Sequence, residues 1–206
     1  MNVLVLGAGG KTGDLVVERA LAAGHTVTAF VHDHTSSQPA GVRRIVGDVE
    51  CPETVSDALT GHDAVIDAIG GKTTYKATGL ESMAARNVVD AMRAQGARRL
   101  VVVSMMGVGE SSAQAPFWYE FLLGPTMLRG VKQDKARMES VVTGSGLDYV
   151  IARPPLLTDD PAEGCTLVVA PDATGHKITR ADLAQFLVDQ LTCDDYLGQA
   201  VVVANR

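Results

Sequence analysis

Residues 3–13 read VLVLGAGGKTG, and this stretch decides the fold. The four apolar residues from Val3 to Leu6 predict a buried strand, which stops at Gly7. The segment DLVVERALAAG at 14–24 follows and has the composition of a helix. A strand that leads through a glycine turn into a helix presents free backbone N–H groups and the positive end of the helix dipole to an anion. We therefore expect a unit that binds the diphosphate of a dinucleotide, NAD or NADP.

The three glycines of this loop have different expected roles. Gly7 permits the tight turn, Gly10 lets the backbone approach the phosphates, and Gly13 lets the helix pack against the strand. Lys11 and Thr12 lie between them and are expected to contact the cofactor as well. The spacing departs from the strict GxGxxG fingerprint, and a glycine triplet alone also occurs in ordinary strand–helix connections. The flanking strand and helix favour the dinucleotide interpretation.

Composition favours one compact α/β domain over residues 1–206, since the chain has 206 residues and is 46% hydrophobic. The net charge is −6 and no basic stripe occurs, which argues against nucleic acid and anionic membranes as partners. We find no signal peptide and no apolar run long enough to span a bilayer. The 3 cysteines and 5 histidines show no metal-ligand spacing. These features predict a soluble cytoplasmic protein without a metal site.

Apolar runs and amphipathic segments alternate along the chain, which predicts a doubly wound parallel sheet with helices on both faces, a Rossmann fold. The expected helix over 79–95 places Leu80, Met83, Ala84, Val88 and Ala91 on one buried stripe and ends at Gly96. The expected strands are 2–6, 27–31, 43–46, 63–69, 99–104, 148–152 and 200–204.

One long segment, 105–131, interrupts this alternation and concentrates aromatic side chains at Phe117, Trp118, Tyr119 and Phe121. Two interpretations stay open: a lid that covers the substrate, or a contact between subunits of a homodimer. Met105, Trp118 and Tyr119 are the expected substrate contacts.

Several further motifs together resemble the atypical short-chain dehydrogenases/reductases, the NAD(P)H-binding group around NmrA-like proteins and biliverdin-IXβ (flavin) reductase. The resemblance covers nearly the whole chain, in the right order, and is closest to the biliverdin-IXβ and flavin reductase branch. The motifs are GAGGKTG, FVHD at 30–33, GDV at 47–49, DAVIDAIG at 63–70, ARNVVDAMRAQGARRLVVVSM at 85–105, QDKARMESVVTGSGLDYVIARPPLLTD at 133–159 and ITRADLAQFLVDQL at 178–191.

The end of the second strand bears on the choice of cofactor. NAD-preferring members of this fold place an acidic residue there to accept the ribose hydroxyls, whereas this chain has Val31 followed by His32. Hydroxyls at 35–37 add donors for a 2′-phosphate, whereas Asp33 would repel it if it points inward. His32 is read either as a ligand contact or as a solvated turn residue. We expect NADPH rather than NADH.

The resemblance implies further cofactor contacts at the carboxyl ends of other strands. Asp48 and Val49 would cover the adenine, although they also suit a simple helix-initiating turn. The remaining implied contacts are Ala68, Ile69, Gly70, Ser104 and Pro154.

Ser104 and Lys135 are the expected catalytic residues. The resemblance implies that Ser104 hydrogen-bonds a substrate carbonyl or the nicotinamide amide. Lys135 occupies the lysine position of the Tyr-x-x-x-Lys pair, but Val131 stands where the proton-donating tyrosine belongs. Lys135 would then contact the cofactor ribose or form a surface pair with Glu139.

The missing tyrosine favours a reductase that passes hydride from NADPH to a conjugated or aromatic small molecule, such as a flavin or quinone, whose anion solvent can protonate. A second hypothesis is a ketoreductase or epimerase with a displaced tyrosine, Tyr75 or Tyr119. A third is a non-catalytic NmrA-like sensor that binds the dinucleotide and a protein partner.

Overall fold

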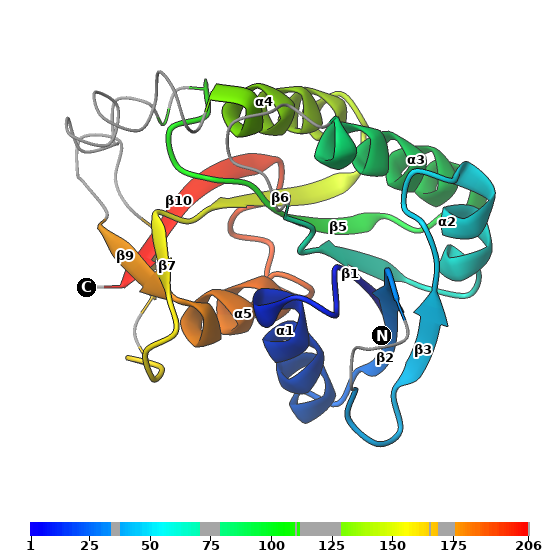
Figure 1. Ribbon diagram of the computed structural model, residues 1–206, viewed down its shortest axis with the longest axis horizontal. Coiled ribbons are helices and arrows are strands. Elements are labelled where there is room, and N and C mark those ends of the chain that lie inside the picture. The colour runs from blue at the N-terminus through cyan, green and yellow to red at the C-terminus, as the bar shows by residue number, and fades with distance from the viewer. Residues whose placement is uncertain are drawn as a thin grey trace.

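The computed structural model describes residues 1–33, 38–70, 79–109, 111, 129–164, 166–168 and 176–205. Its centre is an eight-stranded sheet in the order β3-β2-β1-β4-β5-β6-β10-β8 (Figure 1). The strands are β1 (Asn2–Leu6), β2 (Thr26–Val31), β3 (Arg43–Val46), β4 (Ala64–Asp67), β5 (Arg99–Val103), β6 (Asp148–Arg153), β8 (Thr166–Val168) and β10 (Gln199–Asn205).

Seven of these strands run parallel, which confirms the Rossmann fold expected from the alternating pattern. The eighth strand, β8, is an addition to that expectation, because it pairs antiparallel with β10 at the edge of the sheet. A separate pair of short parallel strands, β7 (Leu156–Thr158) and β9 (Lys177–Thr179), was also not expected.

Helices cover both faces of the sheet (Figure 1). Helices α1 (Lys11–Ala22) and α5 (Arg180–Asp189) share a buried core with one face. Helices α2 (Pro52–Leu59), α3 (Leu80–Gln95) and α4 (Arg129–Thr143) share a second core with the other face. Because both faces are covered, β1 is continuously apolar and buried from Val3 to Leu6.

The direction of winding of the sheet reverses beside β1. From β1 the chain moves outward to β2 and β3, and it then returns to place β4 on the other side of β1. In open α/β sheets, ligands bind at this point, outside the carboxyl ends of the strands. The glycine loop after β1 and the segment 68–70 after β4 therefore lie at the expected cofactor edge.

The expected stripe of α3 is correct in its centre and wrong in its first turn. Val88 is buried, but Met83 is 43% exposed, whereas Glu81 and Ser82 are buried. The reason is that polar groups of α4, rather than the apolar core, face the first turn of α3, as the site below shows. At the other end, Gly96 closes the helix in the left-handed conformation, with φ of 80°, as expected.

Candidate functional site

The glycine loop is built by close backbone approaches. Gly7 has φ of +70°, and a Cβ there would lie 2.8 Å from the Ala68 carbonyl oxygen. A Cβ at Gly13 would lie 2.1 Å from the Gly7 carbonyl oxygen, which no side chain can tolerate. The Gly10 N–H donates to the Gly7 carbonyl at 2.9 Å and tightens the turn. Glycine at 7 and 13 therefore lets β1, α1 and the end of β4 meet at one point.

The N-terminus of α1 fits an anionic diphosphate. No side chain accepts a hydrogen bond from the backbone at its Gly10 cap. Gly10 is exposed, and a Cβ there would meet only the Gly7 carbonyl, at 3.3 Å. The first helical residue, Lys11, is exposed and adds a positive charge, while Thr12 is partly buried in the same turn. These residues would hold the diphosphate through N–H groups and charge.

The Lys11 ammonium is already engaged near this end of α1. Its Nζ lies 2.5 Å from Asp159 Oδ2, and Arg180 Nη1 lies 2.9 Å from Asp159 Oδ1. The Lys11 and Asp159 side chains are largely exposed, so this pair contributes little to stability. It links the first turn of α1 to the segment after β7.

Where we expect the adenosine, β2 ends in buried Val31, and His32 and Asp33 follow in exposed positions. Asp48 Oδ1 accepts from the Glu50 N–H at 2.9 Å, a helix-initiating turn as one interpretation predicted. The Val49 carbonyl accepts from Asn87 Nδ2 at 2.8 Å, which fixes its backbone. The hydroxyls at 35–37 lie outside the described residues.

The end of β4 contains a buried carboxylate that sequence reasoning missed. Asp67 is 3% exposed, and its Oδ1 accepts from the Ile69 N–H at 2.9 Å. This bond turns the chain out of the strand, which is why β4 ends before the predicted residue 69. Burial raises the pKa of Asp67, against the opposing effects of the Ile69 N–H and the Lys135 charge. Gly70 follows at the exposed rim of the edge.

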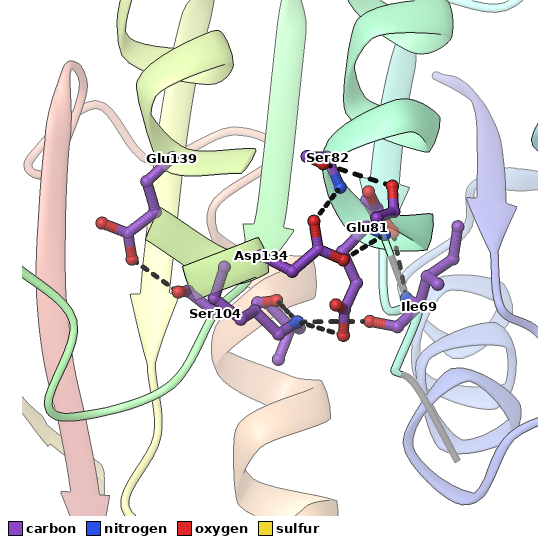
Figure 2. Close-up of polar contacts among 10 residues, drawn as sticks. Ile69, Glu81, Ser82, Ser104, Asp134 and Glu139 are labelled. Carbon is purple, nitrogen blue, oxygen red and sulfur yellow. Dashed lines mark hydrogen bonds and ion pairs between the residues drawn. The ribbon is translucent and has the colours of Figure 1, made fainter. Parts of the chain in front are cut away.

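Lys135 is enclosed by the fold. Its Nζ donates to the carbonyl oxygens of Val103 at 2.8 Å and Ile69 at 3.4 Å, and it lies 3.5 Å from Glu81 Oε1 (Figure 2). An ammonium has three donors, so these three oxygens can engage all of them. The expected surface pair between Lys135 and Glu139 is wrong, because both side chains are buried and Glu139 has other partners.

The neighbouring Asp134 caps α3. Its carboxylate accepts from the backbone N–H groups of Glu81 at 3.1 Å and Ser82 at 3.3 Å (Figure 2). Burial acts to raise the pKa of Asp134, but the hydrogen bonds from Ser82 and Glu81 outweigh it and hold the pKa below its usual value. The acidic residue of the QDKARM motif therefore joins α4 to α3.

Ser104 directly follows β5 and points towards α4. Its Oγ donates to Glu139 Oε1 at 2.5 Å (Figure 2). Arg153, the last residue of β6, donates to the same carboxylate from Nε at 3.0 Å and from Nη2 at 2.7 Å. Glu139 and Arg153 also line a cavity of about 390 Å³, together with Tyr149 and Gly198.

The other predicted site residues fall into two groups. Pro154 is buried, and its carbonyl accepts from the Met106 N–H at 2.9 Å, which joins the segment after β5 to the segment after β6; Met105 in that first segment is partly buried. Trp118 and Tyr119, with Tyr75 and most of the segment 105–131, lie outside the described residues.

Sequence comparison now adds to this geometry. Residues 7–194 match the model of a family described as NAD(P)H-binding. The chain belongs to that NAD(P)H-binding family. The resemblance to atypical short-chain dehydrogenases/reductases is thereby confirmed, and the chain is an NAD(P)H-binding protein of the oxidoreductase type.

Three proteins are similar to this NAD(P)H-binding protein over most of its length. The chloroplastic protein At2g34460 of Arabidopsis thaliana is 29% identical, over 100% of this chain and 77% of that protein. YhfK of Bacillus subtilis, named as an uncharacterized sugar epimerase, is 28% identical, over 93% of this chain and 88% of its own. The solved structure of ChuY, an anaerobilin reductase from Escherichia coli O157:H7, is 25% identical with a TM-score of 0.83, covering 100% and 97% of the two chains.

The sequence predicts neither a membrane span nor a metal site, and the structure bears on both only in the part of the chain that it describes. None of its helices is long and apolar enough to cross a bilayer. Its His, Cys, Asp and Glu side chains form no group of three that could hold a metal ion. The cytoplasmic location stays a prediction, because one relative is chloroplastic.

Proposed function

We propose that this protein is an NADPH-dependent reductase that passes a hydride to a conjugated or aromatic acceptor, such as a flavin or a quinone. The proposal depends on which residues occupy the tyrosine and lysine positions of the Tyr-x-x-x-Lys pair and on what surrounds them. Val131 replaces the tyrosine, and the Lys135 ammonium is enclosed by two strand-end carbonyls and Glu81. Because the tyrosine is absent, Lys135 has no tyrosine whose proton transfer it could promote.

The tyrosines that the structure describes do not supply the missing proton. Tyr149 stands near the start of β6, opposite the cofactor edge, and its hydroxyl donates to the Gly198 carbonyl at 2.8 Å. Tyr196 packs against Phe186 with ring centroids 6.0 Å apart. Without a positioned acid, reduction of an ordinary ketone loses a factor of about 10² to 10⁴. A conjugated acceptor avoids this loss, because its anion is delocalised.

The residues of the chain then act by binding and orientation. The glycine loop and the N-terminus of α1 would hold the diphosphate, and the ends of β4, β5 and β6 would form the floor beneath the nicotinamide. When bound, NADPH supplies a hydride, which is two electrons and one proton. The acceptor gains that hydride and takes its second proton from water, so the reaction consumes one proton and releases the reduced acceptor and NADP⁺.

The preference for NADPH rests on the end of β2. Buried Val31 offers no carboxylate to accept the two ribose hydroxyls or to repel a 2′-phosphate, and exposed His32 offers a ring N–H. The variant His32→Arg should raise the ratio of NADPH to NADH affinity, and His32→Ala should lower it.

Oxidation of NADPH at 340 nm tests the proposal, with riboflavin, FMN and a benzoquinone compared with non-conjugated ketones. We expect conjugated acceptors to have kcat/KM values at least about 100-fold higher. The variant Arg98→Ala, which removes an exposed ion pair with Asp148 at the opposite end of the sheet, should leave these rates unchanged. Absence of turnover across the panel, with the dinucleotide still bound, would contradict the reductase and favour the sensor.

The similarity to YhfK, a protein named as an uncharacterized sugar epimerase, supports a second candidate function. A ketoreductase or epimerase needs a displaced acid, and Tyr75 and Tyr119 are the remaining tyrosines. If Tyr75→Phe or Tyr119→Phe abolishes activity on a ketone while binding of NADPH persists, this second function replaces the first.

A further inference from the structure

The hydroxyl of Ser104 has one proton, and the structure shows where it goes. Ser104 is 4% exposed, and its backbone N–H donates to the Ala152 carbonyl at 2.8 Å, so the residue is fixed between β5 and β6. Its Oγ lies 2.5 Å from Glu139 Oε1 (Figure 2). A carboxylate oxygen only accepts, so the serine must be the donor.

The surroundings of Glu139 make its carboxylate a hydrogen-bond acceptor at both oxygens. Oε1 faces the Ser104 hydroxyl and Arg153 Nε, and Oε2 faces Arg153 Nη2. All three partners are donors, and a guanidinium does not give up its proton. The pair is also sheltered, with side-chain exposures of 5% for Arg153 and 8% for Glu139. Glu139 is thus held as a charged acceptor by a bidentate partner.

We propose that Glu139 is a positioning residue that makes Ser104 an acceptor, and only an acceptor, towards the bound ligands. Because its proton is committed to Glu139, Ser104 offers lone pairs at the cofactor edge. It then recognises an N–H group, either the NH₂ of the nicotinamide carboxamide or a ring N–H of the acceptor. This narrows the role implied by the family resemblance, which allowed either a substrate carbonyl or the nicotinamide amide, because a serine that only accepts excludes the carbonyl.

This polarity agrees with the missing tyrosine. A serine that cannot donate does not polarise a ketone oxygen, so Ser104 gives no help to carbonyl reduction. The inference rests on the nicotinamide site of the proposed function but not on the identity of the acceptor. Binding measurements without turnover therefore distinguish a failure of this inference from a failure of the proposed reductase activity.

The first test compares NADP⁺ with its 3-acetylpyridine analogue, in which a methyl group replaces the carboxamide NH₂ while the carbonyl stays. Calorimetry should show that the wild type binds NADP⁺ about 10-fold more tightly, the value of one good hydrogen bond. Ser104→Ala should reduce this ratio to within about 2-fold, since the acceptor is gone. Glu139→Leu should also reduce it, because the side chain then has no acceptor and the freed hydroxyl can donate to the acetyl carbonyl.

The second test determines whether the N–H group belongs to the acceptor rather than to the nicotinamide carboxamide. If the two dinucleotides bind equally, a flavin should bind more tightly than its N3-methylated form, as measured by quenching of flavin fluorescence, and Ser104→Ala should remove the difference. Either pattern supports the acceptor-only serine and identifies its partner.

Two controls keep the inference falsifiable. Ser140→Ala, on an exposed position of α4, should leave both ratios at the wild-type values. Glu139→Leu removes one partner of a buried ion pair and can fail to fold, in which case the double variant Glu139→Leu with Arg153→Met, which removes both charges, tests the positioning role. Ser104→Ala removes a single oxygen and tests whether Ser104 accepts from the N–H group. Wild-type ratios near 1 with both ligand pairs, or a ratio that survives Ser104→Ala, would overturn the proposal and leave Ser104 as a tie between β5 and α4.

Discussion

At the scale of single residues, three charged side chains are buried close to the edge of the sheet where we expect the cofactor. Asp67, Glu81 and Lys135 are each at most 5% exposed, and Lys135 lies between the ends of β4 and β5. Buried charges cost free energy unless they are paired and hydrogen-bonded. Asp67 receives one backbone N–H and stands near the Lys135 charge, and burial still raises its pKa.

The variant Asp67→Asn should flatten the pH dependence of stability. Because the pKa of Asp67 is raised on folding, its contribution to stability is full below about pH 4, the unfolded value, and is lost as the pH rises through the raised folded value. Asparagine keeps an oxygen for the Ile69 N–H and does not titrate. Urea unfolding between pH 4 and pH 8 should show a smaller loss of stability in the variant.

Asp57→Asn, which alters an exposed carboxylate on α2, provides the matched control and should follow the wild-type profile. Equal pH profiles for Asp67→Asn and the wild type would show that the Asp67 carboxyl is not desolvated in solution.

At the scale of elements, α3 is a helix whose start is capped by another helix. Its own N-cap, Gly79, has no side chain to offer, and Asp134 of α4 accepts the N–H groups of the first turn instead. The periodicity of 79–95 predicts the helix and its end at Gly96, because those depend on local residues. It does not predict the cap, because Asp134 lies 53 residues after Glu81 and 52 residues after Ser82 in the chain.

Asp134→Ala should destabilise the protein by about 2 kcal/mol, since it leaves two helix N–H groups without their acceptor. The lowered pKa of Asp134 means that its contribution is present above about pH 4 and is lost as the pH falls through the lower folded value. Asp90→Ala, on an exposed position of the same α3, should cost under about 0.5 kcal/mol. Equal costs in thermal or urea unfolding would contradict the capping role.

Lys135→Met should cost about 3 kcal/mol, because it removes the cation that faces buried Glu81 and two strand-end carbonyls. Adding Glu81→Gln should recover part of that loss, with a coupling of about 1 kcal/mol or more in a double-mutant cycle. Arg137→Met, at an exposed position of α4, is the control. A Lys135→Met variant of wild-type stability that no longer binds NADPH would show that Lys135 serves the ribose and not the fold.

At the scale of the whole molecule, the parts that could be predicted are those with a strong local period. The central parallel strands carry apolar runs, such as residues 3–6 in β1 and 100–103 in β5, because both faces of the sheet are covered, and these runs are visible in the sequence. Strands β7, β8 and β9 have three residues each, too few for a period to appear. The Ser104–Glu139–Arg153 contact joins β5, α4 and β6, so it depends on how three elements pack.

The glycine loop brings β1, α1 and the end of β4 together. A dinucleotide bound at the N-terminus of α1 should therefore stabilise the folded state of the whole molecule. A ligand at 100 times its Kd stabilises the folded state by about 2.7 kcal/mol, which for a chain of this size raises Tm by about 5 to 10 °C. We expect NADPH to raise Tm more than NADH at equal concentration. Lys11→Ala should reduce the shift, and with it the sensitivity of the shift to salt, because an exposed cation beside the diphosphate is lost. Lys177→Ala removes a lysine paired with Glu163 outside the glycine loop and should leave the shift unchanged. If neither dinucleotide changes Tm at millimolar concentration, the glycine loop does not hold a diphosphate, and the site must be sought elsewhere on the sheet.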